Sequence, residues 1–470
     1  MSCLLGEVGK VIGVTPDSGV QAVISGATHD SRAVKPGWLF CCIPGANVDG
    51  HLYAETAVGA GAAALLCERT LDLDIPQLVV ADARAAMGPV ASRIEGDPSH
   101  HLPVIGVTGT NGKSSVVQIL ADIWAKAGRR ADVYGTMTGA RTTPEAPDLQ
   151  RQLRASLSRG ADAVAMEVSS HALDLCRVAG TRFAASVFTN LGRDHLDFHH
   201  TMDDYFEAKA ALFTAQYTSV GVINLDDQYG IRLGLRVRDD PEVELRGFRL
   251  SDAEKLVIDG PRSHFSWHGR PVVLQLAGRH NVMNALAAAT TAEALGLDEQ
   301  VIVDGLCATE PVRGRFEMID IGQPFKVAVD YAHTPDALAA VLGAAHQVTA
   351  GRVIVVFGCG GDRDQLKRGE MGSVAQSESD VMIITSDNPR SEDPLAIIDE
   401  ILNGTDTGPD TKVIVEADRR RAIAAGLANA SAGDLVLVAG KGHEMTQTIG
   451  DSVQPFDDRQ VIIEELGAMT

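Results

Sequence analysis

The residues G-V-T-G-T-N-G-K-S at positions 106–114 decide how the central part of this chain folds. The apolar residues Val104 and Ile105 precede them, and an apolar stripe with helical spacing runs from 116 to 127 before Gly128 ends it. This order predicts a strand, a glycine-rich loop and a helix. Such a loop turns backbone N–H groups toward a phosphate at the positive end of the helix.

The residues that close this loop carry the expected chemistry. Lys113 would reach the terminal phosphates of a nucleotide, and the Ser114 hydroxyl would bind its magnesium ion. A strict P-loop would begin with glycine at 107, where this chain has Val107. The loop is therefore a P-loop variant, and the wider P-loop class is a poor guide to function. A chance loop rich in glycine, serine and lysine is the alternative. The glycines of the loop are Gly106, Gly109 and Gly112.

Length and charge restrict the class of protein. A chain of 470 residues favours two to four domains. With 41 basic and 62 acidic residues, the net charge of -21 disfavours nucleic acid or an anionic membrane as the main partner. Only 4% of the residues are aromatic, which argues against a base-stacking surface.

The cysteines and the apolar runs indicate a compartment. The seven cysteines are scattered and form no C-x-x-C pair, which is typical of free thiols in a reducing cytosol. The sequence has no apolar run of eighteen residues, and it begins without a basic, then apolar, leader. We therefore expect a soluble cytoplasmic protein, without membrane insertion.

The chain divides into three blocks, which we place at residues 1–100, 101–312 and 313–470. In the first block, apolar runs at 39–43 and 78–80 alternate with alanine-rich stretches that predict helices. The predicted helices cover 54–67 and 83–93, and 96–103, with two prolines, is a candidate linker.

The second and third blocks repeat a pattern of buried strand followed by polar cluster. Runs at 163–166 and 184–191 end in E-V-S-S-H and R-D-H, and a helical face of leucines stands between the P-loop and the first run. Strands that alternate with helices predict a parallel sheet, in which ligands bind beyond the carboxyl ends of the strands. The third block predicts a second such sheet with its own binding site. Its runs cover 353–357, 381–385 and 435–439.

Several polar residues at these strand ends are candidates for chemistry. Glu167 and His195 are good ligands for a divalent ion that bridges phosphates, although residues of these types at strand ends are also often structural. Lys209 lies in a helical pattern, where a lone lysine is usually solvated. In the third block, Arg363 and Arg390 could bind a carboxylate and Glu444 an ammonium, which would suit an amino acid. A surface ion-pair network explains these three residues equally well.

Together these motifs resemble the Mur ligase family over nearly the whole chain, and most closely its diaminopimelate-adding members. The D-N-P-R motif favours diaminopimelate over lysine. The matching motifs are D-S-R at 30–32, G-T-N-G-K-S at 109–114, T-T-P-E at 142–145, A-M-E-V-S-S-H at 165–171, F-T-N-L-G-R-D-H-L-D-F-H at 188–199, Y-F-E-A-K at 205–209, G-R-H-N-V-M-N at 278–284, V-R-G-R-F-E at 312–317, D-Y-A-H-T-P-D at 330–336, G-C-G-G-D-R-D at 358–364, S-D-N-P-R at 386–390 and G-K-G-H-E at 440–444.

The resemblance implies an α/β protein of three domains: an N-terminal UDP-binding domain, a central P-loop ATPase-like domain with a parallel sheet, and a C-terminal Rossmann-like domain. It implies a ligase that adds diaminopimelate to UDP-MurNAc-L-Ala-D-Glu in peptidoglycan precursor synthesis. We expect the meso isomer, and the LL isomer is the open alternative because both present a carboxylate and an ammonium to Arg390 and Glu444. ATP would phosphorylate the γ-carboxylate of D-Glu, and an amine of diaminopimelate would attack the acyl phosphate. The implied cofactors are ATP, two Mg²⁺ ions and a carbamylated lysine, and we expect a monomer.

The resemblance also assigns roles to single residues. The implied catalytic and metal-binding residues are Lys113, Ser114, Glu167, His195 and Lys209, the last as the carbamylated lysine. The implied ATP contacts are Gly109, Thr110, Asn111, Gly112, Lys113, Ser114, Ser115, Asn281, Arg315 and Asp330. The implied contacts to the UDP-muramoyl dipeptide are Ser31, Ala46, Asn47, Val48, Thr142, Thr143, Ser169 and Arg177. The implied diaminopimelate contacts are Arg363, Asp387, Asn388, Pro389, Arg390, Gly440 and Glu444.

Two departures from the family pattern concern the dipeptide contacts. Arg141 precedes T-T-P where some relatives carry asparagine, and Leu175 replaces a glutamine found in others. Every catalytic group is present, so we expect an active enzyme. A folylpolyglutamate synthetase, which shares the ATP domain, and a catalytically silent nucleotide-binding relative are the alternatives.

Overall fold

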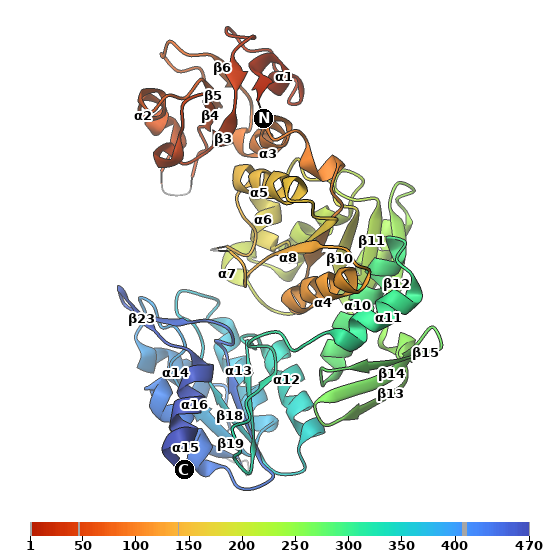
Figure 1. Cartoon of the computed structure of the whole chain (residues 1–470). Coiled ribbons are helices and arrows are strands. Elements are labelled where there is room, and N and C mark those ends of the chain that lie inside the picture. The colour runs from red at the N-terminus through yellow and green to blue at the C-terminus, as the bar shows by residue number, and fades with distance from the viewer. Residues whose placement is uncertain (1, 46–47, 140, 407–410, 470) are drawn as a thin grey trace.

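The computed structural model describes residues 2–45, 48–139, 141–406 and 411–469. Its elements form three domains that follow one another along the molecule, with the N-terminus in the first and the C-terminus in the last (Figure 1). Each domain contains its own largely parallel sheet with helices packed against it. The three-domain α/β architecture expected from the sequence is confirmed, and the boundaries near 100 and 312 stay predictions.

The N-terminal domain has a parallel sheet of four strands in the order β3-β4-β5-β6 and a small antiparallel pair, β1-β2. Its strands are β1 (Cys3–Leu4), β2 (Val23–Ile24), β3 (Gly26–Thr28), β4 (Trp38–Cys41), β5 (Ala64–Cys67) and β6 (Gln77–Val79). Its helices are α1 (Leu5–Lys10), α2 (Ala54–Gly59) and α3 (Ala83–Ile94).

The helix predicted over 54–67 is wrong in its second half. Helix α2 stops at Gly59, and β5 begins at Ala64, between β4 and β6. Gly61 has φ +98° and turns the chain between the two elements. The small alanine side chain can also be accommodated in a strand, and every residue of β5 is buried. Packing within the sheet therefore overrides the helical propensity of this alanine-rich segment.

The central domain contains a parallel six-stranded sheet in the order β12-β11-β10-β7-β9-β8. Its strands are β7 (Val104–Thr108), β8 (Ala131–Tyr134), β9 (Ala163–Glu167), β10 (Ala185–Phe188), β11 (Val220–Asn224) and β12 (Glu244–Phe248). The helices along the chain are α4 (Lys113–Lys126), α5 (Ala146–Ser158), α6 (Ser170–Asp174), α7 (Leu196–His199), α8 (Met202–Ala210) and α9 (Gln228–Arg238).

Both faces of this sheet are covered, which explains the continuous apolar runs of its inner strands. Ile105 and Val107 of β7 belong to one apolar core with α4, whereas Val104 belongs to the core on the opposite face with α5. The domain ends in an antiparallel sheet and two helices that pack on α4. These elements are β13 (Glu254–Asp259), β14 (Arg262–Trp267), β15 (Arg270–Leu274), α10 (Arg279–Ala294) and α11 (Glu299–Ala308).

The C-terminal domain has a second six-stranded sheet, ordered β16-β17-β21-β18-β19-β20, in which only β16 is antiparallel. Its strands are β16 (Glu317–Met318), β17 (Lys326–Asp330), β18 (Val353–Phe357), β19 (Val381–Ile384), β20 (Lys412–Val415) and β21 (Leu435–Ala439), followed by the hairpin β22 (Thr446–Ile449) and β23 (Ser452–Pro455). Its helices are α12 (Pro335–Val348), α13 (Leu366–Ser377), α14 (Pro394–Leu402), α15 (Arg419–Asn429) and α16 (Asp458–Met469).

The strand order brings the polar clusters of each sheet together. In the central sheet, β7 lies between β9 and β10, so the P-loop stands next to Glu167 and to the residues that follow β10. In the C-terminal sheet, the loops after β17, β21, β18 and β19 are neighbours for the same reason. The carboxyl ends of parallel strands are where ligands bind in such sheets.

Two further observations concern the cysteines and the helices. All seven cysteines are free, and four of them, Cys41, Cys42, Cys67 and Cys359, are buried. Among the described residues, no helix combines the length and the apolar character needed to cross a bilayer.

Candidate active site

The P-loop leaves β7 and ends at the first residue of α4. Gly109 and Gly112 have φ of +148° and +89°, which favours glycine. Space requires glycine as well: a Cβ on Gly109 would lie 1.9 Å from Thr189 Oγ1, and one on Gly112 would lie 2.3 Å from Asn284 Oδ1. The Lys113 ammonium spans the loop and donates to the carbonyls of Gly109 (2.8 Å) and Thr110 (2.9 Å).

Glu167, at the end of β9, faces the first turn of α4. Its Oε1 accepts from the Ser114 hydroxyl at 2.9 Å and from the backbone N–H of Thr136 at 3.0 Å. Arg315, from the start of the C-terminal domain, donates to the same Ser114 hydroxyl at 3.1 Å. A carboxylate and a hydroxyl in contact are the oxygen donors that a hard divalent cation prefers, so this donor set fits magnesium.

Lys209 is buried, in contrast to the solvated lysine that its lone helical position suggests. Only 1% of it is exposed, and its Nζ donates to the Gly109 carbonyl at 3.0 Å. The ammonium lies 4.6 Å from the centre of the Tyr205 ring. Burial, and then the charge of Lys113, hold the pKa of Lys209 well below its usual value, which favours the neutral, nucleophilic amine.

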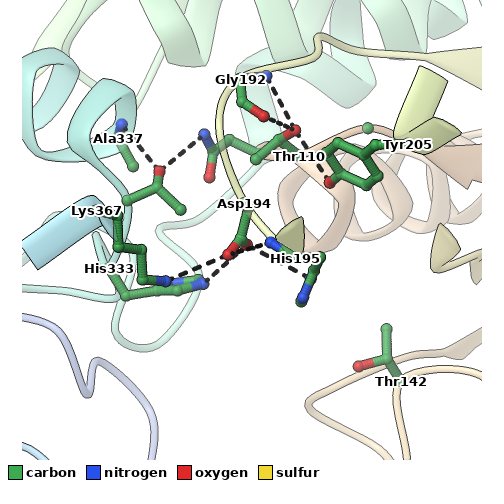
Figure 2. A network of polar contacts seen from close by, with 12 residues as sticks. Thr110, Thr142, Gly192, Asp194, His195, Tyr205, His333, Ala337 and Lys367 are labelled. Atoms are coloured by element: carbon green, nitrogen blue, oxygen red, sulfur yellow. Dashed lines mark hydrogen bonds and ion pairs between the residues drawn. The ribbon is translucent and has the colours of Figure 1, made fainter. Parts of the chain in front are cut away.

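Asp194 and His195 follow β10 and lie between the central and C-terminal domains. Figure 2 shows the Asp194 carboxylate where Lys367 and His333, both from the C-terminal domain, meet His195 of the central domain. The distances to the Asp194 carboxylate oxygens are 3.2 Å from Lys367 Nζ, 3.7 Å from His333 Nε2 and 3.4 Å from His195 Nε2. Burial lowers the pKa of His195, so its ring is neutral and able to bind a metal.

A cavity of about 460 Å³ opens beside the P-loop. Asp330 forms one wall, and its carboxylate accepts from the backbone N–H groups of Phe316 and Ala332, both at 2.7 Å. Asn281 is held from α10 by a 2.7 Å bond to the Ala277 carbonyl. The expected nucleotide residues that line this cavity are Asn111, Gly112, Ser115, Asn281, Arg315 and Asp330.

A second cavity, of about 290 Å³, also borders the P-loop. Asn111, Gly112 and Arg315 line both cavities, so the two share a wall. The second cavity brings together three sets of expected residues. It is lined by Thr110, Lys113, Ser114, Glu167 and His195 at the phosphate end, by Thr142 and Ser169 at the dipeptide end, and by Arg363, Asp387, Asn388, Arg390, Gly440 and Glu444 from the C-terminal domain.

The C-terminal wall of this second cavity contains charges of both signs. Arg390 has φ +54°, donates its Nη1 to the Gly361 carbonyl at 2.6 Å, and forms an isolated parallel β-bridge with Ile449. Asn388 donates to Glu444 Oε2 at 2.7 Å. Asp387 is 8% exposed, and its Oδ2 has no hydrogen-bond partner among the described residues. Two arginines and two carboxylates here are the groups that an amino acid would need.

The residues expected at the UDP-muramoyl end are more dispersed. Thr143 is buried and donates to the Glu167 carbonyl at 2.9 Å, and Arg177 binds Glu145 at 2.9 Å. Ser31 begins a short 3-10 helix, Ser31–Ala33, and Val48 is exposed. A cavity of about 750 Å³ between the N-terminal and central domains is lined by Asp30 and Ala33, next to Ser31. Ala46 and Asn47 lie outside the described residues.

Some expected residues line neither cavity beside the P-loop, and some unassigned ones do. The described expected residues that line neither cavity are Ser31, Val48, Gly109, Thr143, Arg177, Lys209 and Pro389. Asp194, His333 and Lys367 line the second cavity, although sequence reasoning assigned none of them. Asp194 and His333 stand inside the quoted motifs, which was an available signal, whereas Lys367 stands just beyond one.

Comparison with known proteins agrees with this geometry. The profile of the Mur ligase middle domain matches residues 107–292, that of the Mur ligase glutamate ligase domain matches 314–442, and that of the Mur ligase family catalytic domain matches 23–106. A relative from Streptomyces coelicolor is 44% identical over 98% of this chain and 96% of its own length. One from Streptomyces avermitilis is 43% identical over 98% and 95%. Both are named UDP-N-acetylmuramoyl-L-alanyl-D-glutamate–2,6-diaminopimelate ligase.

A solved structure of a protein with the same name has a TM-score of 0.70 with this chain at 32% identity, and covers 100% of this chain and 99% of its own. Three α/β domains whose P-loop and C-terminal strand ends share one cavity define a nucleotide-dependent ligase architecture. The chain belongs to the Mur ligase family.

Proposed function

We propose that this chain is an ATP-dependent ligase that adds meso-diaminopimelate to the D-Glu γ-carboxylate of UDP-MurNAc-L-Ala-D-Glu. The observation that carries the proposal is the wall shared by the two cavities. A nucleotide in the first cavity would place its terminal phosphate at Gly112 and Lys113, within reach of the second cavity. The arginines and carboxylates that line the second cavity would bind the amino acid. Relatives 44% and 43% identical that carry this enzyme's name support it.

The reaction needs such an arrangement because a carboxylate is a poor acylating agent. Transfer of the γ-phosphoryl group of ATP to the D-Glu carboxylate forms an acyl phosphate and ADP. The amine then attacks the acyl carbon, phosphate leaves, and an amide forms. Backbone N–H groups at the N-terminus of α4, the Lys113 ammonium and the Arg315 guanidinium are positioned for the negative charge on the phosphates.

We further propose that Ser114, Glu167, His195 and a carbamylated Lys209 hold Mg²⁺. The donor set fits, because a hydroxyl, a carboxylate, a neutral imidazole and a carbamate all offer lone pairs to a hard cation. When bound, the ions would neutralise charge on the phosphates. The Lys209 amine is buried beside the P-loop carbonyl of Gly109, so conversion of this neutral amine to a carbamate would place a negative charge at the phosphate site.

The remaining roles complete the proposal. Arg363 and Arg390 would bind a carboxylate of diaminopimelate, and Asp387, Asn388 and Glu444 its ammonium. The UDP-muramoyl part would lie from Ser31 and Val48 of the N-terminal domain to the Thr142 and Ser169 end of the second cavity. We expect the enzyme to work as a monomer in the cytoplasm.

The test is product formation by mass spectrometry. Purified protein, ATP, Mg²⁺ and UDP-MurNAc-L-Ala-D-Glu are mixed with meso-diaminopimelate, LL-diaminopimelate, L-lysine or L-ornithine in separate tubes. We expect an ATP-dependent product with meso-diaminopimelate. A lysine product would keep the class and refute the assigned specificity. Absence of product in every tube would refute the proposed reaction, and a parallel tube with folate and glutamate would test the folylpolyglutamate alternative.

A further inference from the structure

A fully buried lysine stands beneath the amino-acid end of the second cavity. Lys441 follows β21 and has no exposed surface. It belongs to the G-K-G-H-E motif, but none of the roles assigned above uses it. A buried ammonium is costly unless hydrogen bonds satisfy its three donors, so its partners show what it holds in place.

The Lys441 ammonium has three acceptors. They are the Thr446 carbonyl at 2.7 Å, Glu444 Oε2 at 3.2 Å and Asn388 Oδ1 at 3.3 Å. One acceptor anchors the lysine to the β22 hairpin, and the other two are side chains that line the cavity. Lys441 is thus satisfied, and it joins the loop after β19 to the loop after β21.

Lys441 and the backbone N–H of Thr448 together fix which way the Asn388 amide faces. Asn388 Oδ1 accepts from Lys441 and from the Thr448 N–H at 2.9 Å, so the amide oxygen is turned away from the carboxylates. The Asn388 NH₂ group therefore donates to Glu444 Oε2 at 2.7 Å and to Asp387 Oδ1 at 3.2 Å. One oxygen of each carboxylate is occupied in this way.

The other oxygens are left for a ligand. Asp387 Oδ2 is buried without a hydrogen-bond partner, and within the described part of the chain Glu444 Oε1 takes part in no hydrogen bond. Gly440 keeps the space beside Asp387 open, because a Cβ there would lie 2.6 Å from Asp387 Oδ2. Two free carboxylate oxygens beside an open space are a site for an ammonium group.

We propose that Lys441 is a positioning residue that orients Asn388 and Glu444 so that Asp387 and Glu444 bind the non-reacting ammonium of the diamino acid. The inference rests on the proposed function. An amine held between two carboxylates stays protonated and cannot attack, because a nucleophilic amine must be neutral. The site thereby selects which of the two amines of diaminopimelate is acylated.

The test compares two acceptors. Meso-diaminopimelate has the second ammonium, whereas L-2-aminopimelate has the same chain and carboxylates without it. We expect Lys441→Met to lower kcat/KM for diaminopimelate about tenfold or more through KM, as for loss of a charge-assisted hydrogen bond. The same variant should change kcat/KM for L-2-aminopimelate by less than about threefold, and KM for ATP should not change. Lys412→Met, at an exposed lysine that bonds Asn429, is the matched control.

A double variant tests whether Lys441 acts through Glu444. If it does, the double variant Lys441→Met, Glu444→Gln should lower kcat/KM for diaminopimelate no further than the worse of the two single variants, because both changes remove the same interaction. Three results would each overturn the proposal. They are an equal loss of kcat/KM for both acceptors in Lys441→Met, an unchanged KM for diaminopimelate, and a double variant whose loss of kcat/KM is the product of the two single losses. If Lys441→Met does not fold, Lys441→Gln, which keeps hydrogen-bond donors without the charge, takes its place. Failure of both variants to fold would make Lys441 a structural anchor and would also overturn the proposal.

These outcomes are distinct from failure of the proposed function. A wild-type protein that makes no product from either acceptor refutes the ligase assignment. A wild-type protein that turns over both acceptors, while the Lys441 variants lose them equally, refutes only the role of Lys441.

Discussion

The carboxylate of Asp194 and the ammonium of Lys367 form an ion pair of 3.2 Å that joins the central domain to the C-terminal domain. Both side chains are 7% exposed, so little solvent screens the pair. Asp194 precedes His195 in the chain, and its pKa is held well below its usual value although burial alone would raise it, because His333, His195 and Lys367 face it. The contact between the domains is thus directly coupled to a proposed metal ligand.

The first prediction concerns this ion pair. Lys367→Met leaves Asp194 buried with one cation fewer, a loss worth about 3 kcal/mol for a buried pair. We expect the C-terminal domain to close less completely on the central one, about a hinge near residues 310–314, and kcat to fall at least about tenfold. Small-angle scattering with an ATP analogue and the UDP-substrate measures closure, with Lys412→Met as control. Normal compaction in the Lys367 variant would contradict the coupling.

The second prediction concerns the phosphate site. Lys113→Ala removes the only side-chain charge contributed by the loop 109–113, and we expect turnover to fall by at least about a hundredfold. The turnover rate is measured as the ADP formed in samples quenched at successive times. Lys126→Ala, at the last turn of the same helix, should keep the wild-type rate. A Lys113 variant with the wild-type rate would refute the phosphate-site assignment.

The third prediction concerns the amino-acid end of the second cavity. Arg390→Ala should raise KM for diaminopimelate about tenfold or more and leave KM for ATP within about twofold, because an arginine–carboxylate contact is lost at one substrate only. Arg390→Lys should restore little, because an ammonium lacks the planar fork. Steady-state kinetics with each substrate varied gives both values. An equal rise in the two KM values would count against the assignment.

The fourth prediction concerns Lys209. Incubation with ¹³C-bicarbonate should give one carbamate signal in the carbon NMR spectrum, because burial favours the neutral amine that reacts with carbon dioxide. Lys209→Met should lack that signal, and Lys126→Met should retain it. A signal that survives in the Lys209 variant would place the carbamate elsewhere.

The fifth prediction concerns pH and stability. Burial, together with the charges of Arg315, Arg313 and His333, lowers the pKa of His443 from 6.5 to about 4. As pH falls through 6.5, His443 becomes protonated in the unfolded chain, whereas in the folded chain it stays neutral until about pH 4. Stability is therefore lost on acidification across this window, by roughly 2 kcal/mol at this partly exposed ring.

The variant His443→Gln isolates this contribution. Its free energy of unfolding, measured by urea denaturation at several pH values, should decline less than that of the wild type between pH 6.5 and 4. His346→Gln, at an exposed histidine of the same domain, should follow the wild-type curve. Parallel curves for wild type and His443→Gln would contradict the predicted pH dependence.

Sequence patterns were most informative where local chemistry leaves few choices. The glycines at 109 and 112 satisfy backbone angles and contacts that other residues cannot, so the strand–loop–helix around them is readable without a structure. The apolar run at 163–166 became β9 because both faces of the sheet are covered. Alanine-rich 54–67 misled because alanine suits a helix and a buried strand alike, and only neighbouring strands chose between them.

By itself, then, the sequence determined the P-loop, the succession of strands and helices, and the residue types at each strand end, because these depend on local conformation and periodicity. Tertiary structure alone decided that Lys209 is buried, that Lys441 turns the Asn388 amide, and that Asp194 meets Lys367 across 173 positions of the chain. Burial and pairing of charges depend on which strand ends become neighbours, and a local sequence pattern does not encode contacts between residues so far apart in the chain.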